Sequence, residues 1–175
     1  IPPGGAIITN GRIKAGVTTV GSLNEPGGTP LTATDFNGGP QTTSDVGLRY
    51  IFPDGSGETE AISWGTQAEG WGASADGESI FFNRDVGSTD SSLYNAAFSN
   101  PSDNLAESTV DMVTGPLRVN HKYEPSPDSE SLFQVTVVLE NTSGSTISDI
   151  RYRRTMDCEL VFDKTFSMLL PWHKT

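Results

Sequence analysis

The segment 132–140 constrains the fold of this chain more than any other part of the sequence. Its apolar residues recur at every second position, at Phe133, Val135, Val137 and Leu139. Successive side chains of a β-strand point to opposite faces, so this alternation predicts a strand whose apolar face, formed by these four side chains, is buried. Nowhere in the sequence does an apolar pattern of period 3.6 continue for three turns, so we expect no long amphipathic helix.

A second strand is expected directly after this one. Residues 141–145 have the Asn, Ser and Gly composition of a turn, and residues 147–154 then alternate again, with Ile150 and Tyr152 set against charged neighbours. Two alternating segments joined by a short polar turn are typical of a β-hairpin. We therefore predict that these two strands pair with each other.

Turn residues punctuate the rest of the chain. It contains 19 Gly and 11 Pro in 175 residues. The dipeptides typical of tight turns are Asn10-Gly11, Asn37-Gly38, Asp54-Gly55 and Asp76-Gly77. Shorter alternating segments lie at 46–52, 62–64, 80–82, 110–112 and 117–123. Short strands separated by turns predict an all-β fold, an antiparallel β-sandwich in a single domain. We place this domain at residues 1–157, with 1–39 as an irregular entry, and regard 158–175 as an apolar C-terminal tail.

The charge of the chain limits its partners. Asp and Glu number 22 against 11 Lys and Arg, a net charge of −11. Nucleic acid is excluded as a partner, because phosphate binding needs a basic surface. No apolar run reaches the length of a membrane span. Acidic surfaces mostly serve solubility, but carboxylates also bind hard cations, so we expect any bound metal to be calcium-like and held by oxygens. The candidate ligands are Asp35, Asn37, Asp45 and Asp54, which lack the spacing of an EF-hand.

The catalytic candidates belong to no known motif. His121 shares the inward face of its expected strand with Val119 and Tyr123. A half-buried imidazole beside a tyrosine has the chemistry of a general base, although a histidine in this setting is more often hydrogen-bonded within a core.

A second candidate is a carboxylate between two aromatic residues. Trp64 and Trp71 flank Glu69 in a Gly-rich segment. Exposed aromatic rings beside a carboxylate suit a carbohydrate platform or a glycosidase cleft. The alternative is that both tryptophans close one end of the sandwich.

Two arginines form a candidate anion site. Alternation places Arg151 and Arg153 on one face of their strand, where they would hold a carboxylate or a phosphate. Ion pairs across the sheet with Glu140 or other acids are the ordinary alternative.

Several segments resemble a known group of proteins. The chain reads Glu-Gly-Trp-Gly at 69–72, LRVNHKYEPS at 117–126 and Arg-Tyr-Arg-Arg-Thr-Met-Asp at 151–157. With their surroundings at 64–72 and 133–157, these segments resemble a β-rich region of large exported bacterial surface proteins, some of which carry sorting anchors of the PEP-CTERM type. The resemblance implies an exported or cell-surface setting and a β-sandwich. It assigns no activity and no site residue.

The chain departs from this resemblance after Asp157. Such sequences continue with an aromatic residue, an acidic residue and a further β-rich stretch, whereas this chain reads Cys158-Glu159-Leu160 and ends at Thr175. A foreign tail on a truncated parent and a natural divergent end both fit. A truncated sandwich would have an open sheet edge, so we expect either the tail or a second copy of the chain to cover it, and we favour a homo-oligomer.

The sequence thus supports two functions. The first is a module of an exported protein, either structural or ligand-binding. Such a module would bind a carbohydrate or make a calcium-dependent contact with a surface. The second is a hydrolase of esters, glycosides or phosphoesters that uses carboxylates with His121 or a bound metal. A sandwich hosts either function, so fold alone does not separate them.

Overall fold

The computed structural model describes residues 4–34, 40–63, 69–83 and 90–156. These residues form an all-β fold, with one short 3-10 helix, η1 (Ser91–Leu93). The strands are β1 (Ala6–Thr9), β2 (Ile13–Val17), β3 (Leu31–Thr34), β4 (Pro40–Thr43), β5 (Leu48–Ile51), β6 (Glu58–Glu60), β7 (Gly70–Ala75), β8 (Glu78–Asn83), β9 (Tyr94–Ser102), β10 (Leu105–Met112), β11 (Leu117–Pro125), β12 (Phe133–Asn141) and β13 (Ile150–Thr155). Within this part of the chain, no helix is long and apolar enough to cross a membrane.

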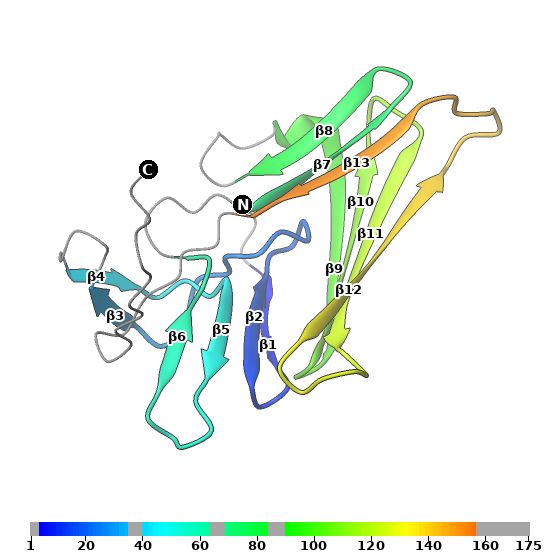
Figure 1. Ribbon diagram of the computed structural model, residues 1–175. Helices are drawn as coiled ribbons and strands as arrows, with labels where there is room; N and C mark the ends of the chain where they lie inside the picture. Colours follow the sequence, from blue (N-terminus) through cyan, green and yellow to red (C-terminus); the bar gives the residue numbers. More distant parts are fainter. Residues whose placement is uncertain (1–3, 35–39, 64–68, 84–89, 157–175) are drawn as a thin grey trace, which may run out of the picture.

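All strand pairs are antiparallel, as the sequence predicted. The long sheet has the order β12-β11-β10-β9. Two smaller sheets have the orders β1-β2-β5-β6 and β13-β7-β8, and β3 and β4 form a separate ribbon (Figure 1).

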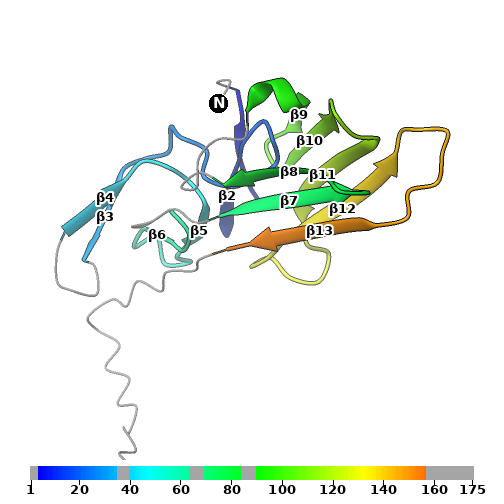
Figure 2. The same cartoon turned by 90° about the horizontal axis from the view of Figure 1, so that it is seen from above.

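The two smaller sheets pack against one face of the long sheet. Trp71, Ile80 and Phe82 of the β13-β7-β8 sheet share a core with Val110 and Val119 of the long sheet. A second core joins residues of β1 and β2 to Ala106 and Tyr123, further along the same long sheet. The fold is therefore a two-layer arrangement in which one layer is split into two sheets, and Figure 2 shows the β13-β7-β8 sheet in front of the long strands. The line where the two smaller sheets meet over the long sheet is called the seam below.

Three of the four predicted turns connect paired strands. Asn10-Gly11 joins β1 to β2, Asp54-Gly55 joins β5 to β6, and Asp76-Gly77 joins β7 to β8. Asp76 and Gly77 both have positive φ, at 49° and 97°. This is the backbone of the two-residue turn that the Asp-Gly pair favours. Asn37-Gly38 lies outside the described residues.

The predicted hairpin of 133–139 with 147–154 is wrong. β12 pairs with β11, whereas β13 pairs with β7 in the opposite layer. The chain crosses between the layers after β12, and the carboxylate of Asp76 fixes this crossing by accepting the backbone N–H groups of Ser148 and Asp149, both at 2.9 Å. The polar segment after β12 is therefore a link between layers and not a hairpin turn.

The apolar face of β12 is less buried than its sequence suggested. Phe133, Val137 and Leu139 are half-buried and pack against the two cores, but Val135 is 38% exposed. The cause is position, because β12 is an edge strand of the long sheet and is covered on only part of its inner face.

The N-terminal stretch, expected to be an irregular entry, contributes to the core. β1 and β2 form a hairpin in the β1-β2-β5-β6 sheet, and Ile8 and Val17 are fully buried in it. The chain then stays buried through residues 18–24. Residues 1–3 and the expected tail at 158–175 lie outside the described residues.

Candidate functional site

Residues 18–24 form a buried turn at the seam, called the seam turn below. It is closed by backbone hydrogen bonds from Thr18 N to Ser22 O (2.8 Å) and from Gly21 N to Thr18 O (2.9 Å). Its carbonyl groups point outward and accept hydrogen bonds from both layers. Trp71 Nε1 on β7 donates to Val20 O (2.8 Å), and Tyr123 Oη on β11 donates to Gly21 O (2.6 Å). Each partner satisfies a carbonyl that would otherwise be buried without one, so the seam turn ties the layers together.

Glu69 and Arg154 form an ion pair beside the seam turn. Glu69, directly before β7, is 0% exposed. Its Oε1 lies 2.6 Å from Arg154 Nη2 on the neighbouring β13, and its Oε2 accepts the backbone N–H of Leu23. The Arg154 guanidinium also lies over the ring of Tyr123, with its carbon 5.5 Å from the ring centre. The carboxylate thus binds the seam turn to β13.

The charges of this pair follow from its burial. Burial raises the pKa of Glu69, and the attraction of Arg154 and the N–H of Leu23 act against that rise. Burial acts to lower the pKa of Arg154, but Tyr123 and Glu69 outweigh it, and the net pKa is raised. Arg154 therefore stays cationic, and its positive charge favours the ionised form of Glu69 against the net rise that burial causes in the pKa of this carboxyl.

His121 lies at the centre of the seam, on the inward face of β11 as predicted. It is 1% exposed, and its ring centre lies 4.7 Å from that of Trp71. Its Nε2 is 3.0 Å from Tyr152 Oη. Burial, and after it the positive charge of Arg154, lower the pKa of His121 to about 3. The imidazole is therefore neutral at physiological pH.

Gly21 allows this close packing. Its φ is +75°, and a Cβ atom at this position would come within 2.6 Å of His121 Nδ1. Glycine alone combines that backbone conformation with the absence of a side chain. The seam turn therefore fits against the imidazole only with glycine at position 21.

The arrangement at the seam is suited to structure and not to turnover. A general base must come within hydrogen-bond reach of its substrate. Glu69 and His121 are instead enclosed by the seam turn, β7 and β13, where their polar contacts are to Leu23, Arg154 and Tyr152. Trp71 is 2% exposed and belongs to the core. This burial agrees with a packing role for its ring and not with a carbohydrate platform. Trp64 lies outside the described residues.

The two arginines expected to bind an anion do share an outward face of β13. Both are exposed, and Arg151 forms an ion pair with Asp149 at 2.7 Å. Glu140, expected as a cross-strand partner, lies 3.4 Å from Arg118 instead. The arginine of β13 that turns inward is Arg154, whose side chain is 19% exposed and which sequence reasoning passed over. Strand alternation carries the signal for it, because Arg154 has the same parity as Tyr152 and so takes the inward face.

Of the four expected calcium ligands, the two within the described residues lie at opposite ends of β5. Asp45 precedes β5, and Asp54 lies in the exposed turn at its other end, where its carboxylate accepts the N–H of Ser56 at 2.9 Å. Asp35 and Asn37 lie outside the described residues. Elsewhere in 4–156, among the residues whose placement is described, no three His, Cys, Asp or Glu side chains cluster as metal ligands do.

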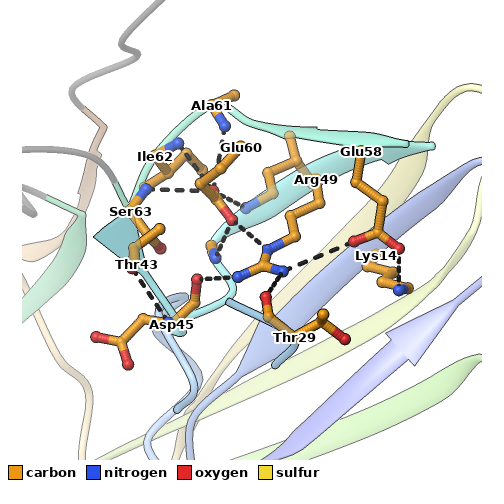
Figure 3. Close-up of polar contacts among 12 residues, drawn as sticks. Lys14, Thr29, Thr43, Asp45, Arg49, Glu58, Glu60, Ala61, Ile62 and Ser63 are labelled. Atoms are coloured by element: carbon orange, nitrogen blue, oxygen red, sulfur yellow. Dashed lines mark hydrogen bonds and ion pairs between the residues drawn. The ribbon is translucent and has the colours of Figure 1, made fainter. Parts of the chain in front are cut away.

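A second buried ion pair was not predicted (Figure 3). Arg49 of β5 is 0% exposed, and its Nε donates to Glu60 Oε2 at 3.1 Å. Its other nitrogens donate to the backbone oxygens of Thr29 (2.6 Å) and Asp45 (2.8 Å). Glu60 in turn accepts backbone N–H groups from Gly47, Leu48, Ala61, Ile62 and Ser63. This cluster organises the loops around β5 and β6, and its hydrogen-bonding groups are taken up by the protein itself.

An apolar groove of about 150 Å³ opens between the β1-β2-β5-β6 sheet and the start of β12. It is lined by Ile13, Ala15, Leu23, Leu48, Tyr123, Ser131, Leu132, Phe133, Val135 and Met156. Neither His121 nor Glu69 lines it, and its walls carry almost no polar groups. The groove suits an apolar side chain better than a reacting substrate.

No family model, curated protein or solved structure matches this chain.

Proposed function

We propose that this chain is a non-catalytic β-sandwich module of an exported bacterial protein, with a structural or surface-contact role. The observation that carries the proposal is the burial of the two groups best suited to acid–base chemistry. Glu69 and His121 are 0% and 1% exposed, and both hold the seam closed. The exported setting is supported by the sequence resemblance.

The hydrolase alternative has weaker support. Hydrolysis by a carboxylate and an imidazole needs both groups to face a water molecule and a scissile bond. In this chain Glu69 Oε1 faces Arg154 and His121 Nε2 faces Tyr152. Opening the seam to a substrate would break these contacts and expose the core around Trp71.

The proposed surface contact would be made by exposed parts of the chain. Carbohydrate binding through Trp71 is disfavoured because its indole is buried and donates to Val20 O. A calcium-dependent contact through Asp45 and Asp54 is disfavoured because they lie at opposite ends of β5. The contact that we propose is self-association of the chain through an open sheet edge, supported by the exposed apolar side chains of β12.

A panel of chromogenic esters, glycosides and phosphoesters, assayed with and without a chelator, tests this function. We expect no turnover above that of buffer. Glu69→Gln and His121→Gln are the matched variants, because each keeps a polar group of similar reach. Turnover by the native chain that either variant abolishes, with the fold intact by near-UV circular dichroism, would overturn the proposal in favour of a hydrolase.

A further inference from the structure

We propose that two copies of this chain pair through β12, antiparallel and about a two-fold axis at Val137, so that two four-stranded sheets become one continuous sheet. The inference rests on the proposed module function, and it names the edge, the partner and the register of the contact.

The other edges of these sheets carry features that discourage pairing. β9, at the far side of the long sheet, contains Pro101 and faces a register shift between Leu105 and Glu107 of β10. β13 carries arginines at three of its six positions. β1, β3, β4 and β6 have only three or four residues, and β8 has six and begins with the charged Glu78.

β12 lacks these features. It is nine residues long, contains no proline and has no charged residue before Glu140. Val138 on its outer face is 51% exposed, and Leu132 at its start is 55% exposed. A long uncharged edge with exposed apolar side chains is a template for another strand.

The hydrogen-bond pattern shows which groups of β12 face outward. Ser126 N donates to Leu132 O at 3.1 Å, and Thr142 N donates to Pro116 O at 2.8 Å, at the two ends of the β11–β12 ladder. The register between these ends is continuous. In an antiparallel ladder, residues alternate between bonding the neighbour and facing away from it. Even-numbered residues therefore bond β11, and the N–H and C=O groups of Phe133, Val135, Val137, Leu139 and Asn141 point to the open edge.

Two-fold symmetry fixes how these odd-numbered residues meet. With the axis at Val137, this residue faces its own copy, Val135 faces Leu139, and Phe133 faces Asn141. Each facing pair exchanges two backbone hydrogen bonds, so all five outward residues find partners. An axis moved to Val135 would leave Asn141 without a partner in the strand.

The side chains also fit this register. Val135 meets Leu139 on the inner face, and Gln134 meets Glu140, so the two Glu140 carboxylates stay apart. On the outer face Thr136 meets the exposed Val138. Opposing this contact is the net charge of −11 on each copy. Salt screens such repulsion, so association should strengthen as ionic strength rises.

The first test is the mass of the full chain by light scattering across a range of salt and protein concentrations. We expect twice the chain mass of 18.7 kDa at high salt. Val137→Pro removes an outward N–H and leaves the ladder to β11 intact, so it should raise the dimer dissociation constant about thirtyfold, since each copy loses a hydrogen bond.

Ala96→Pro on β9 is the matched control. Val113 N donates to Leu93 O, which makes odd-numbered β9 residues bond β10 and turns the N–H of Ala96 to the opposite edge. This variant should dimerise like the native chain. A native chain that stays monomeric at high salt, or a dimer that Val137→Pro leaves unchanged, would overturn the proposal.

Disulfide trapping tests the register. In a Cys158→Ser background, the double variant Thr136→Cys with Val138→Cys should oxidise to a covalent dimer, because these positions face each other across the axis. Either single variant should not. Cross-linking by the single variants alone would show another register.

A monomeric full chain that dimerises once it is stopped after Asp157 would show that its own C-terminal segment, and not a second copy, covers the edge. None of these readouts depends on the substrate panel, so the two proposals fail separately.

Discussion

Lowering the pH should destabilise the chain through His121. The imidazole titrates near its ordinary pKa of 6.5 when the chain is unfolded and at about 3 in the folded chain. Between these values the unfolded chain binds a proton that the folded chain does not, so stability falls as pH falls through this window. At pH 5 the loss amounts to about 2 kcal/mol relative to pH 7.5, because the unfolded imidazole is then almost fully protonated.

Urea unfolding at pH 7.5 and pH 5.0 measures this loss. His121→Asn removes the titrating group, whereas the carboxylates that also titrate in acid remain in both chains. We expect the native chain to lose about 2 kcal/mol more than the variant between the two pH values. Equal losses would refute the reasoning, because they would mean that His121 takes up its proton in the folded state. In a His173→Gln chain, the remaining imidazole NMR signal should not titrate above about pH 4.

Two further substitutions test the buried turn and the second ion pair, each against a control in the same chain. Gly21→Ala should cost about 2–4 kcal/mol of unfolding free energy, from backbone strain and the clash with the imidazole, whereas Gly11→Ala has similar strain at φ +87° and open space around it, and should cost about 1–2 kcal/mol. Equal costs in chemical denaturation would show that the clash is relieved without penalty. Arg49→Met should cost about 3–5 kcal/mol, because it leaves a buried carboxylate without its cation, and Arg151→Met in an exposed pair should change stability by less than about 0.5 kcal/mol. Similar small effects at both positions would contradict the structural role of the buried pair.

Local features of the fold were predictable from the sequence. The strands at 117–125 and 133–141 alternate between apolar and polar residues, apart from Val138, and three Asn-Gly or Asp-Gly turns lie where their backbone chemistry requires them. These signals depend only on neighbouring residues. The pairing of β12 and β13 was not predictable in this way, because the partner of β13 is β7, some eighty residues earlier, and a contact through Asp76 decides the crossing.

The buried ion pairs were hidden for a related reason. Arg and Glu are residue types expected at the surface. Their burial becomes favourable only with a partner of opposite charge, and here that partner is far away in the sequence. Glu69 attracted attention because it lies between two tryptophans, but its partner Arg154 was passed over for Arg151 and Arg153. His121 was placed correctly on an inward face, since alternation along a single strand is enough to do so.

The role of the Glu69–Arg154 pair is the central claim, and two neighbouring residues of β13 test it directly. Arg154→Met removes the cation that faces Glu69, and Arg153→Met removes an exposed one. The measurement is the unfolding free energy of both variants in urea. We expect Arg154→Met to lose about 3 kcal/mol and Arg153→Met less than about 0.5 kcal/mol. Equal, small losses would contradict the account, because they would show that the folded chain does not depend on this pair and that Glu69 is free for another role.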